Sequence, residues 1–452
     1  MRIYRESAPV SIIEVLNARD RRAARQRERL RSGGTLVWLT MNIPGAVKIT
    51  PPIGEAFEAG VSAIAAAFGG IPERFCSNAG LEACLLCAHP AAEVKRKAAR
   101  IEDASGVGRL LDIDVLGADG AKLSREALGL PPRSCLICSG PAFICARSRA
   151  HGLDALRAEV DRRIALWRAD ALPKRIGAMA VDALIREAET TPKPGLVDRR
   201  NCGSHPDMDL DLLRRSALSL GDYFTVCART GFAAPAGTDI FPELQRAGIA
   251  AEQTMQRATG GVNAHRGAIF SLGLLCAAAA QCLREYDAPA ERICRLAGEL
   301  VAPHAARTLA ALTPETARSF GEALYAATGI RGARGEAADG FPSLTGIALP
   351  MLEKYAALGA EAAGARTLIH LLAQTDDTTL IRRGGLARAE QMRASAQKLA
   401  AGEMTCDELT ALDDLFISEN LTCGGCADLL ACAYFLQAAA EEPSLPDQSM
   451  NI

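Results

Sequence analysis

The sequence TTPKPGLVDRRNCGSHPDMD, residues 190–209, interrupts a chain that otherwise carries long apolar helical patterns. Pro192 and Pro194 disfavour helical geometry in the residues before them, and Gly195 permits a turn that a side chain would hinder. A helix predicted over residues 174–188 must therefore end here. A long polar loop inside an apolar chain is usually functional, and a solvated connector is the alternative.

The rest of the chain is long and largely apolar. It has 452 residues, of which 49% are hydrophobic but only 4% aromatic, as is typical of helices rich in alanine and leucine. This length predicts two or more domains. The net charge of −2 excludes a global electrostatic attraction to nucleic acid or to a membrane surface.

Several features predict a cytoplasmic protein. The N-terminus is charged and lacks the apolar core and cleavage site of a signal peptide. The longest apolar run, residues 268–280, is too short to span a bilayer. Fifteen cysteines without a secretion signal are typical of reduced thiols in the cytosol.

The first predicted helix begins at a capping box formed by Ser11 and Glu14 and ends near Arg31. Nine arginines and only four acidic residues fall within the first 35 positions. Arg19 and Arg22 are three residues apart and share one face of this helix. The face either contacts a phosphate group or is a solvated basic surface.

Strand patterns are confined to the first third of the chain. Residues 35–40 and 83–88 predict buried strands, residues 53–68 and 91–100 predict helices, and the turn after the first strand carries Lys48. Residues 108–116, GRLLDIDVL, predict a further strand in a hairpin closed by the Asp119-Gly120 turn.

Two aspartates on this last strand are candidate metal ligands. Asp112 and Asp114 are two residues apart, so both carboxylates project from the same side of the strand. Two carboxylates on a rigid strand can hold Mg²⁺ against a polyphosphate. The D-x-D pattern alone is a weak signal, which the strand context and the preceding Arg109 strengthen.

A cysteine-rich segment follows at residues 131–151, PPRSCLICSGPAFICARSRAH. Its Cys135, Cys138, Cys145 and His151 have the spacing of a compact zinc knuckle. Alternatively, these thiols are only small apolar side chains.

The domain boundary is predicted where a helix over residues 153–169 meets Leu172 and Pro173. Residues 1–170 then form an α/β or α+β domain, residues 171–440 a larger all-α domain, and residues 441–452 a disordered acidic tail. Within the second domain, the helix over residues 268–283 is apolar on nearly every side and is therefore expected to be central.

Polar loops interrupt the helical pattern of the second domain five times. After the first, they are residues 259–267, 329–340, 374–385 and 420–430. Each places glycine beside a carboxylate or an arginine near a helix start, and Asn263 is either part of a phosphate site or only an N-cap. We expect these loops to converge on one charged site.

The second domain closely resembles the triphosphoribosyl-dephospho-coenzyme A synthase of citrate lyase. The resemblance covers about residues 176–438 and rests on TPKPGLVDRRNCGSHPDMD, TGGVNAHRGAIFSLGLLCAA, GARGEA, DDTTLIRRGG and NLTCGGCADLL. The first domain resembles the phosphoribosyl-dephospho-coenzyme A transferase of citrate lyase, also called the holo-acyl carrier protein synthase of citrate lyase. The matching segments are VSIIEVLNARDRRAARQ, MNIPGAVK, GRLLDIDVL and LSREALGLPPRSCLICSGPAFICARSRAH.

This double resemblance implies a natural fusion of two transferases, the first of nucleotidyltransferase type. The synthase would convert ATP and 3′-dephospho-coenzyme A to triphosphoribosyl-dephospho-coenzyme A and adenine. The transferase would then move the phosphoribosyl-dephospho-coenzyme A unit to a serine of the lyase's acyl carrier subunit, releasing pyrophosphate. The implied partners are thus ATP, dephospho-coenzyme A and the carrier. The aspartate pair predicts Mg²⁺ as cofactor, and the net charge predicts neither nucleic acid nor a membrane as partner.

The sequence departs from the synthase pattern at three places. Ala264-His265-Arg266 stands where Thr-His-Lys is usual, and Thr422-Cys423-Gly424-Gly425-Cys426 stands where Ser-Pro-Gly-Gly-Ser is usual. Thr379 often has Asn as its counterpart. Charge and glycines are kept, whereas the hydroxyls at positions 264 and 426 are lost.

The chemistry of the synthase requires acid–base groups and cations. Breaking an adenine–ribose bond develops positive charge on the sugar, a hydroxyl must be activated, and adenine must be protonated. The acid–base candidates, whose roles the sequence leaves open, are Glu187, Asp198, His205, Asp207, His265, Glu336, Asp377 and Asp428. The triphosphate-binding candidates are Lys193, Asn263, Arg266, Arg334, Arg383, Gly424 and Gly425.

Two other functions remain open at the level of sequence. Malonate decarboxylase carries the same prosthetic group, so the synthase domain alone does not indicate the target enzyme, whereas the transferase domain favours citrate lyase. A zinc-stabilised assembly factor of the lyase without catalytic activity is the other alternative.

Overall fold

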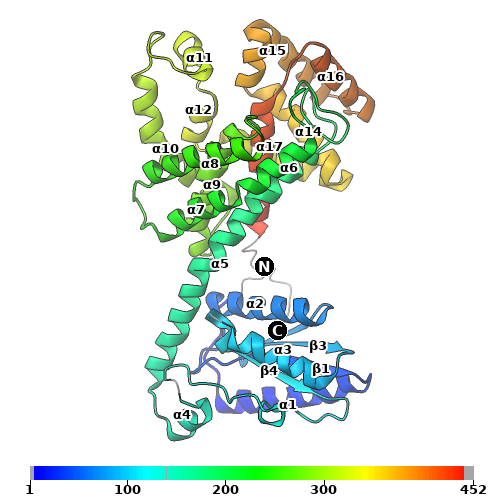
Figure 1. Cartoon of the computed structure of the whole chain (residues 1–452), viewed down its shortest axis with the longest axis vertical. Coiled ribbons are helices and arrows are strands. Elements are labelled where there is room, and N and C mark those ends of the chain that lie inside the picture. Colours follow the sequence, from blue (N-terminus) through cyan, green and yellow to red (C-terminus); the bar gives the residue numbers. More distant parts are fainter. Residues whose placement is uncertain (1–4, 105, 139, 442–452) are drawn as a thin grey trace. The chain divides into compact units, whose positions relative to one another are not determined.

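The computed structural model describes residues 5–104, 106–138 and 140–441 (Figure 1). These residues form two compact units, one within residues 5–168 and one within 169–441. The first unit combines helices with a four-stranded antiparallel sheet, and the second is helical throughout its described part. This confirms an α+β part followed by a larger all-α part. The predicted tail lies outside the described residues, except for Glu441 at the end of the last helix.

The sheet of the first unit has the strand order β2-β3-β1-β4. The strands are β1 (Thr35–Met41), β2 (Glu73–Ser77), β3 (Gly80–Cys87) and β4 (Leu111–Leu116). The prediction missed β2, because this edge strand buries none of its side chains fully and so has no clear apolar pattern. The predicted strand over 108–116 begins late, since Gly106–Leu110 forms the 3-10 helix η1. Beyond the Asp119-Gly120 turn only a single bridge forms, between Leu116 and Lys122.

Helices cover both faces of this sheet. On one face, α2 (Pro51–Phe68) and α3 (Ala91–Asp103) pack on alternate residues of β1 and β4, among them Val37 and Ile113 (Figure 1). On the other face lies α1 (Ile12–Leu30), where Trp38 stacks on Phe75 with ring centroids 5.5 Å apart. Helix α1 begins at the expected capping box. The Ser11 hydroxyl accepts the N–H of Glu14, and the Glu14 carboxylate accepts the N–H of Ser11.

The helix α5 (Leu153–Glu189) runs through the position where a break was predicted. Pro173 lies inside it, so the predicted helix end at Leu172 and Pro173 is wrong. Proline removes one backbone hydrogen bond, but the neighbouring Leu172 and Ile176 are buried in the core of the second unit. Tertiary packing of this apolar stripe outweighs the local preference.

We expect the chain to tolerate separation within α5 after Asp170. Val160 and Ile164 belong to a core cluster of the first unit, and Leu172 and Ile176 to the core of the second. Fragments 1–170 and 171–452 therefore keep complete cores and should each be soluble and unfold cooperatively on heating. Moving the cut to follow Ile176 serves as the control, because losing two buried side chains should cost roughly 2–5 kcal/mol each. An insoluble fragment 171–452 would contradict the independence of the two units.

The second unit is built around α9 (Arg266–Arg284), as predicted for its apolar stretch. Nearly every residue of 268–283 is buried, and α9 contacts α7 (Gly221–Ala233), α8 (Phe241–Ala258), α10 (Ala290–Ala310) and α17 (Gly424–Glu441). By length and composition α9 could cross a membrane, but its apolar window is 83% buried, as in the core helix of a soluble protein.

The remaining helices complete the second unit, and most of them are labelled in Figure 1. They are α6 (Leu210–Ser219), α11 (Phe320–Thr328), α12 (Gly332–Ala338), α13 (Leu349–Lys354), α14 (Ala360–Gln374), α15 (Thr378–Ala400) and α16 (Cys406–Ser418). Three of the predicted loops are largely helical. Most of 329–340 forms α12, residues 378–385 belong to α15, and Asp428 lies inside α17, which begins at Gly424.

Candidate functional site

The loop over residues 190–209 is held by buried carboxylates. Asp198 is 4% exposed and accepts backbone hydrogen bonds from Lys193 at 3.0 Å, Arg200 at 2.7 Å and Asn201 at 3.1 Å. Burial raises the pKa of Asp198 above its ordinary value, and these three donors oppose that effect. Asp198 therefore shapes the loop and lines neither of the cavities described below.

A second carboxylate, Asp413 on α16, completes this support and was missed by the sequence analysis. It accepts hydrogen bonds from the Gly195 N–H at 2.9 Å and the Asn201 amide at 2.9 Å, and forms an ion pair with Arg200 at 2.5 Å. Gly195 has φ +65°, and a Cβ there would lie 2.2 Å from the carbonyl oxygen of Leu421. Glycine is thus required at this turn, as expected from the sequence.

The loop presents a buried cation at its start. Lys193 is 1% exposed, and its Nζ lies 2.5 Å from the Glu187 carboxylate and 2.7 Å from the Glu187 carbonyl oxygen. Close by, the buried His265 has its Nδ1 2.7 Å from Ser216 Oγ. Its Nε2 has no hydrogen-bond partner among the described residues. Burial, assisted by the charge of Lys193, lowers the pKa of His265 to about 4, so the imidazole is neutral at physiological pH.

Asp428 projects from α17 towards the N-terminus of α9, where it accepts the N–H of Ala268. A Cβ on Gly267 would lie 2.0 Å from Asp428 Oδ2, so only glycine lets the carboxyl group approach this closely. Burial raises the pKa of Asp428 well above its ordinary value, and the nearby Glu187 and Asp377 raise it further. Both effects favour the neutral form of this carboxyl group.

Two adjoining cavities meet at Asp428. The larger has a volume of about 750 Å³ and the smaller about 180 Å³. Residues that line both are Asn263, Arg266, Gly267, Thr379 and Asp428. The predicted residues that line only the smaller cavity are Glu187, Lys193, His205, His265 and Gly424, and those that line only the larger are Glu336, Asp377 and Gly425. All five polar loops thus contribute to one pair of cavities.

Three of the lining residues also connect the loops to one another. Asp377 caps α15 by accepting the N–H groups of Thr379 at 2.8 Å and Leu380 at 3.0 Å, and it also accepts the N–H of Cys426 in α17 at 2.8 Å. Glu336 accepts the N–H of Ser343 at 2.8 Å and its hydroxyl at 3.0 Å, and burial raises the pKa of Glu336. His205 Nε2 lies 2.9 Å from Thr422 Oγ1, and burial lowers the pKa of this histidine.

Three further candidates line neither cavity, as is also true of Asp198. Asp207 is exposed, and Arg334 forms an ion pair with Glu322 at 3.1 Å. Arg383 instead joins two loops, with Nη1 2.9 Å from the Ser204 carbonyl oxygen and 2.6 Å from Asn420 Oδ1.

Two arginines that the sequence analysis did not select line the larger cavity. Arg331 and Arg382 line it, where Arg334 and Arg383 were predicted. Consecutive helical residues point about 100° apart, so Arg382 and Arg383 cannot face the same way. The sequence motifs contain both arginines of each pair, but they do not indicate which one faces inward.

The predicted aspartate pair lies on β4 of the first unit. Asp112 and Asp114 are partly exposed and alternate with the buried Leu111, Ile113 and Val115, so both project from one face of the sheet, as expected. Asp112 Oδ1 lies 2.7 Å from Arg133, and Asp114 Oδ1 lies 2.6 Å from Lys122. The second oxygen of each carboxylate has no hydrogen bond or ion pair within the described ranges.

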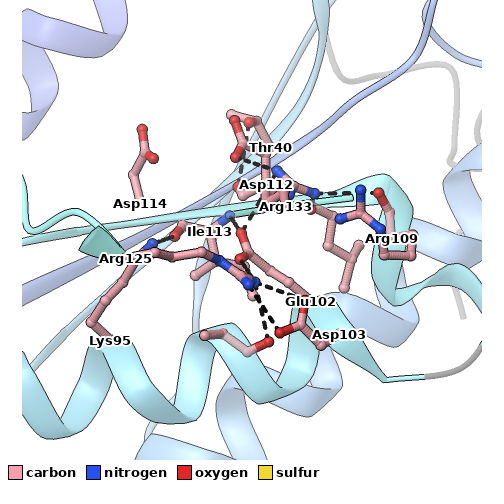
Figure 2. A network of polar contacts seen from close by, with 12 residues as sticks. Thr40, Lys95, Glu102, Asp103, Arg109, Asp112, Ile113, Asp114, Arg125 and Arg133 are labelled. Carbon is pink, nitrogen blue, oxygen red and sulfur yellow. Dashed lines mark hydrogen bonds and ion pairs between the residues drawn. The ribbon is translucent and has the colours of Figure 1, made fainter. Parts of the chain in front are cut away.

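The strand that carries these carboxylates is fixed at its free edge. The Ile113 carbonyl oxygen accepts a hydrogen bond from Lys95 Nζ at 2.9 Å, and the Ile113 N–H donates to Glu102 Oε1 at 2.8 Å (Figure 2). Arg125 pairs with the buried Glu102 at 2.6 Å. These side chains from outside the sheet satisfy the polar groups of Ile113 on an edge strand and so brace β4.

The predicted basic residues of the first unit have different environments. Arg22 pairs with Glu82 at 2.8 Å on the sheet, whereas Arg19 is exposed. Lys48 donates to the Ile43 carbonyl oxygen at 2.6 Å, and burial lowers its pKa. Arg109 is bound to the Ser134 carbonyl oxygen beside the Asp112 network (Figure 2).

The four predicted metal ligands of the first unit do come together. One ligand atom from each of Cys135, Cys138, Cys145 and His151 lies within 4.8 Å of the others. All fifteen cysteines of the chain are free. The C-x-x-C pair at Cys423 and Cys426 is buried in the second unit and contributes to packing.

Comparison with known proteins gives the same division of the chain. Residues 10–166 match the family described as CitX, apo-citrate lyase phosphoribosyl-dephospho-CoA transferase, and residues 173–446 match CitG, ATP:dephospho-CoA triphosphoribosyl transferase. "Protein CitXG" of Haemophilus influenzae is 33% identical over 95% of this chain and 96% of its own length. "Protein CitXG" of Leuconostoc mesenteroides is 30% identical over 94% of this chain and 97% of its own length.

A shorter relative matches the second unit alone. The 2-(5''-triphosphoribosyl)-3'-dephosphocoenzyme-A synthase of Escherichia fergusonii is 37% identical over 58% of this chain and 90% of its own length. Both family matches are to transferases, which favours an enzyme over a non-catalytic assembly factor. The chain belongs to the CitXG family and is a transferase in which a CitX part precedes a CitG part.

Proposed function

We propose that the chain makes the prosthetic group of citrate lyase in its second unit and attaches it in its first. The CitG part would join ATP to 3′-dephospho-coenzyme A with release of adenine. The CitX part, a nucleotidyltransferase-type domain, would then transfer the phosphoribosyl-dephospho-coenzyme A unit to a serine of the acyl carrier subunit and release pyrophosphate. The observation that carries the synthase step is the pair of cavities that meet at Asp428.

The arginines of the larger cavity suit a nucleoside triphosphate, and five carboxyl groups line the same cavity. Arg266, Arg331 and Arg382 line it, and its glycines allow close approach to backbone N–H groups at helix starts. Its volume of about 750 Å³ falls in the range of nucleotide-sized ligand sites. We assign ATP to this cavity, and the reacting ribose of dephospho-coenzyme A to the smaller one.

The reaction needs one proton acceptor and one proton donor where the cavities meet. His265 Nε2 is unpartnered among the described residues and lines the smaller cavity, so it can take the proton of the attacking ribose hydroxyl. The hydroxyl oxygen forms the new bond to C1 of the ATP ribose, and the electron pair of the broken bond leaves with adenine. Asp428, whose pKa burial raises, can give its proton to adenine. Return of the proton from His265 to Asp428 restores the site.

In the first unit, Asp112 and Asp114 are suited to hold Mg²⁺. They share one face of a braced strand, and one oxygen of each is without a partner within the described ranges. Two carboxylates together with phosphate oxygens and water are the ligand set that Mg²⁺ prefers. When bound, the ion would neutralise charge developing on the departing pyrophosphate. Arg133 and Lys122, already beside the two aspartates, can contact the same phosphate oxygens.

The choice of target rests on the first unit. A synthase part alone would serve malonate decarboxylase equally well, because the resemblance gives both enzymes the same prosthetic group. The CitX match is to a family described by apo-citrate lyase. We therefore propose the acyl carrier subunit of citrate lyase as the protein partner and the cytoplasm as the site of action.

Purified full-length protein should release adenine from ATP only when dephospho-coenzyme A is present. Chromatography of the nucleotides measures this first step. Addition of the apo carrier subunit should then give a mass increase equal to one phosphoribosyl-dephospho-coenzyme A unit, together with pyrophosphate. Release of ADP instead of adenine, or release of adenine from ATP alone, would contradict the synthase assignment. Omission of Mg²⁺ is the control for the second step.

A further inference from the structure

The first unit contains a group of soft metal ligands apart from its aspartate pair. The ligand atoms of Cys135, Cys138, Cys145 and His151 all lie within 4.8 Å of one another, and the sulfurs of Cys138 and Cys145 are 3.5 Å apart. Tetrahedral zinc with Zn–S and Zn–N bonds of ordinary length separates its ligand atoms by roughly 3.5–3.8 Å. The four side chains thus surround a space of the size that one Zn²⁺ requires.

The backbone around the cluster holds this arrangement. The Cys135 N–H donates to the Gly140 carbonyl oxygen at 2.7 Å, and the Ile137 N–H points at Cys135 Sγ at 3.5 Å. Helix α4 (Ala142–Ser148) supplies Cys145 and ends at Arg149, whose left-handed φ of 51° turns the chain towards His151. A backbone N–H donated to sulfur stabilises a thiolate, which is the form of cysteine that binds metal.

Packing accounts for Cys135, which is buried, but not for the rest of the cluster. Helix α4 has no buried residue, and Phe143 and Ile144 are each 52% exposed. A helix of seven residues that buries no side chain is unstable by itself. Cys138 is exposed and Cys145 only partly buried, so neither thiol acts as an apolar core residue. Among the described residues, the buried His151 Nε2 also lacks a hydrogen-bond partner.

The cluster is tied to the aspartates through the residues that precede it. Arg133, two positions before Cys135, donates to Asp112 Oδ1 at 2.7 Å and to the Leu111 carbonyl oxygen at 2.5 Å (Figure 2). Arg109 donates to the carbonyl oxygen of Ser134, between Arg133 and Cys135. The position of Arg133 against Asp112 therefore depends on how the cysteine loop is held.

We propose that Cys135, Cys138, Cys145 and His151 bind one structural Zn²⁺, and that this zinc site positions Arg133 at Asp112. Three thiols and one imidazole in tetrahedral reach select zinc over hard cations such as Mg²⁺. Binding releases the three thiol protons and involves no redox change. The metal supplies the stability that the local apolar core does not.

Metal content tests the zinc site independently of any activity. Full-length protein purified without chelator should contain about one zinc per chain. Cys145→Ser should lose most of it, whereas Cys76→Ser, which removes an exposed thiol of β2, should keep it. In cobalt-loaded protein, the thiolate-to-metal absorption should weaken in Cys138→Ser. A stable full-length chain that contains no zinc, and takes up neither zinc nor cobalt when they are added, would overturn the proposal.

The positioning role rests on the proposed transfer reaction and has a separate readout. Removing zinc with a chelator should slow carrier loading by roughly tenfold or more and raise the Mg²⁺ concentration needed for half-maximal rate. Adding zinc back should restore both, and adenine release by the second unit should not change. Arg133→Gln should reproduce the Mg²⁺ effect, and chelation should then add little to it, since the two changes act on one interaction. Fully additive effects would show that zinc does not act through Arg133.

Discussion

Asp428→Asn should lower adenine release by roughly 10²–10⁴-fold, the range expected when a general acid is lost. Asparagine keeps the shape of the side chain and can still accept the N–H of Ala268, but it has no proton to give. Burial raises the pKa of Asp428, so the native rate should fall as pH rises through this raised pKa, where the carboxyl group becomes charged. The variant should lack this alkaline limb. Initial rates of adenine release across pH measure both effects.

Two further substitutions test whether the position of Asp428 matters. Asp182→Asn, on the exposed side of α5, removes a carboxylate of the same unit and should leave the rate unchanged. Gly267→Ala should slow the reaction strongly, because its new Cβ would lie 2.0 Å from Asp428 Oδ2. Gly346→Ala is the matched control, since that glycine is exposed and has no atom near the added methyl group. Near-normal adenine release by folded Asp428→Asn would refute the assignment.

Asp112→Asn should reduce loading of the carrier subunit by about a hundredfold or more while adenine release continues. The substitution keeps the side-chain volume and removes the charge that a divalent cation needs, and stabilisation by a metal ion is worth several kcal/mol. Triphosphoribosyl-dephospho-coenzyme A should therefore accumulate. Mass spectrometry of the carrier and chromatography of the intermediate measure the two steps in one reaction.

The separation of the two steps is the decisive feature of this experiment. Asp20→Asn, an exposed position on α1, is the control for a lost carboxylate in the same unit. Asp112→Asn also breaks the ion pair with Arg133, so Arg133→Gln shows how much of the loss comes from that contact alone. If Asp112→Asn abolished adenine release as well, or affected neither step, the aspartates would not serve the transfer reaction.

The sequence by itself determined the features that depend on neighbours in the chain. The capping box of Ser11 and Glu14 predicted the start of α1, because both partners lie within one turn. Alternation along β4 placed Asp112 and Asp114 on one face, because side chains alternate in any strand. The spacing of Cys135, Cys138, Cys145 and His151 predicted their cluster, because so short a segment can bring four ligands together in few ways. Motifs in both halves were sufficient to indicate the family.

Only the tertiary structure decided which charged residues face the cavities and how their pKa values are shifted. Asp198 and Asp377 look alike in sequence, but three backbone donors hold Asp198 inside its loop, away from the cavities. The continuity of α5 through Pro173 depends on buried partners from elsewhere in the unit. The raised pKa of Asp428 likewise arises from burial and from Glu187 and Asp377, which are distant in the chain. Desolvation and long-range charge are sums over spatial neighbours, and a local sequence pattern does not contain those neighbours.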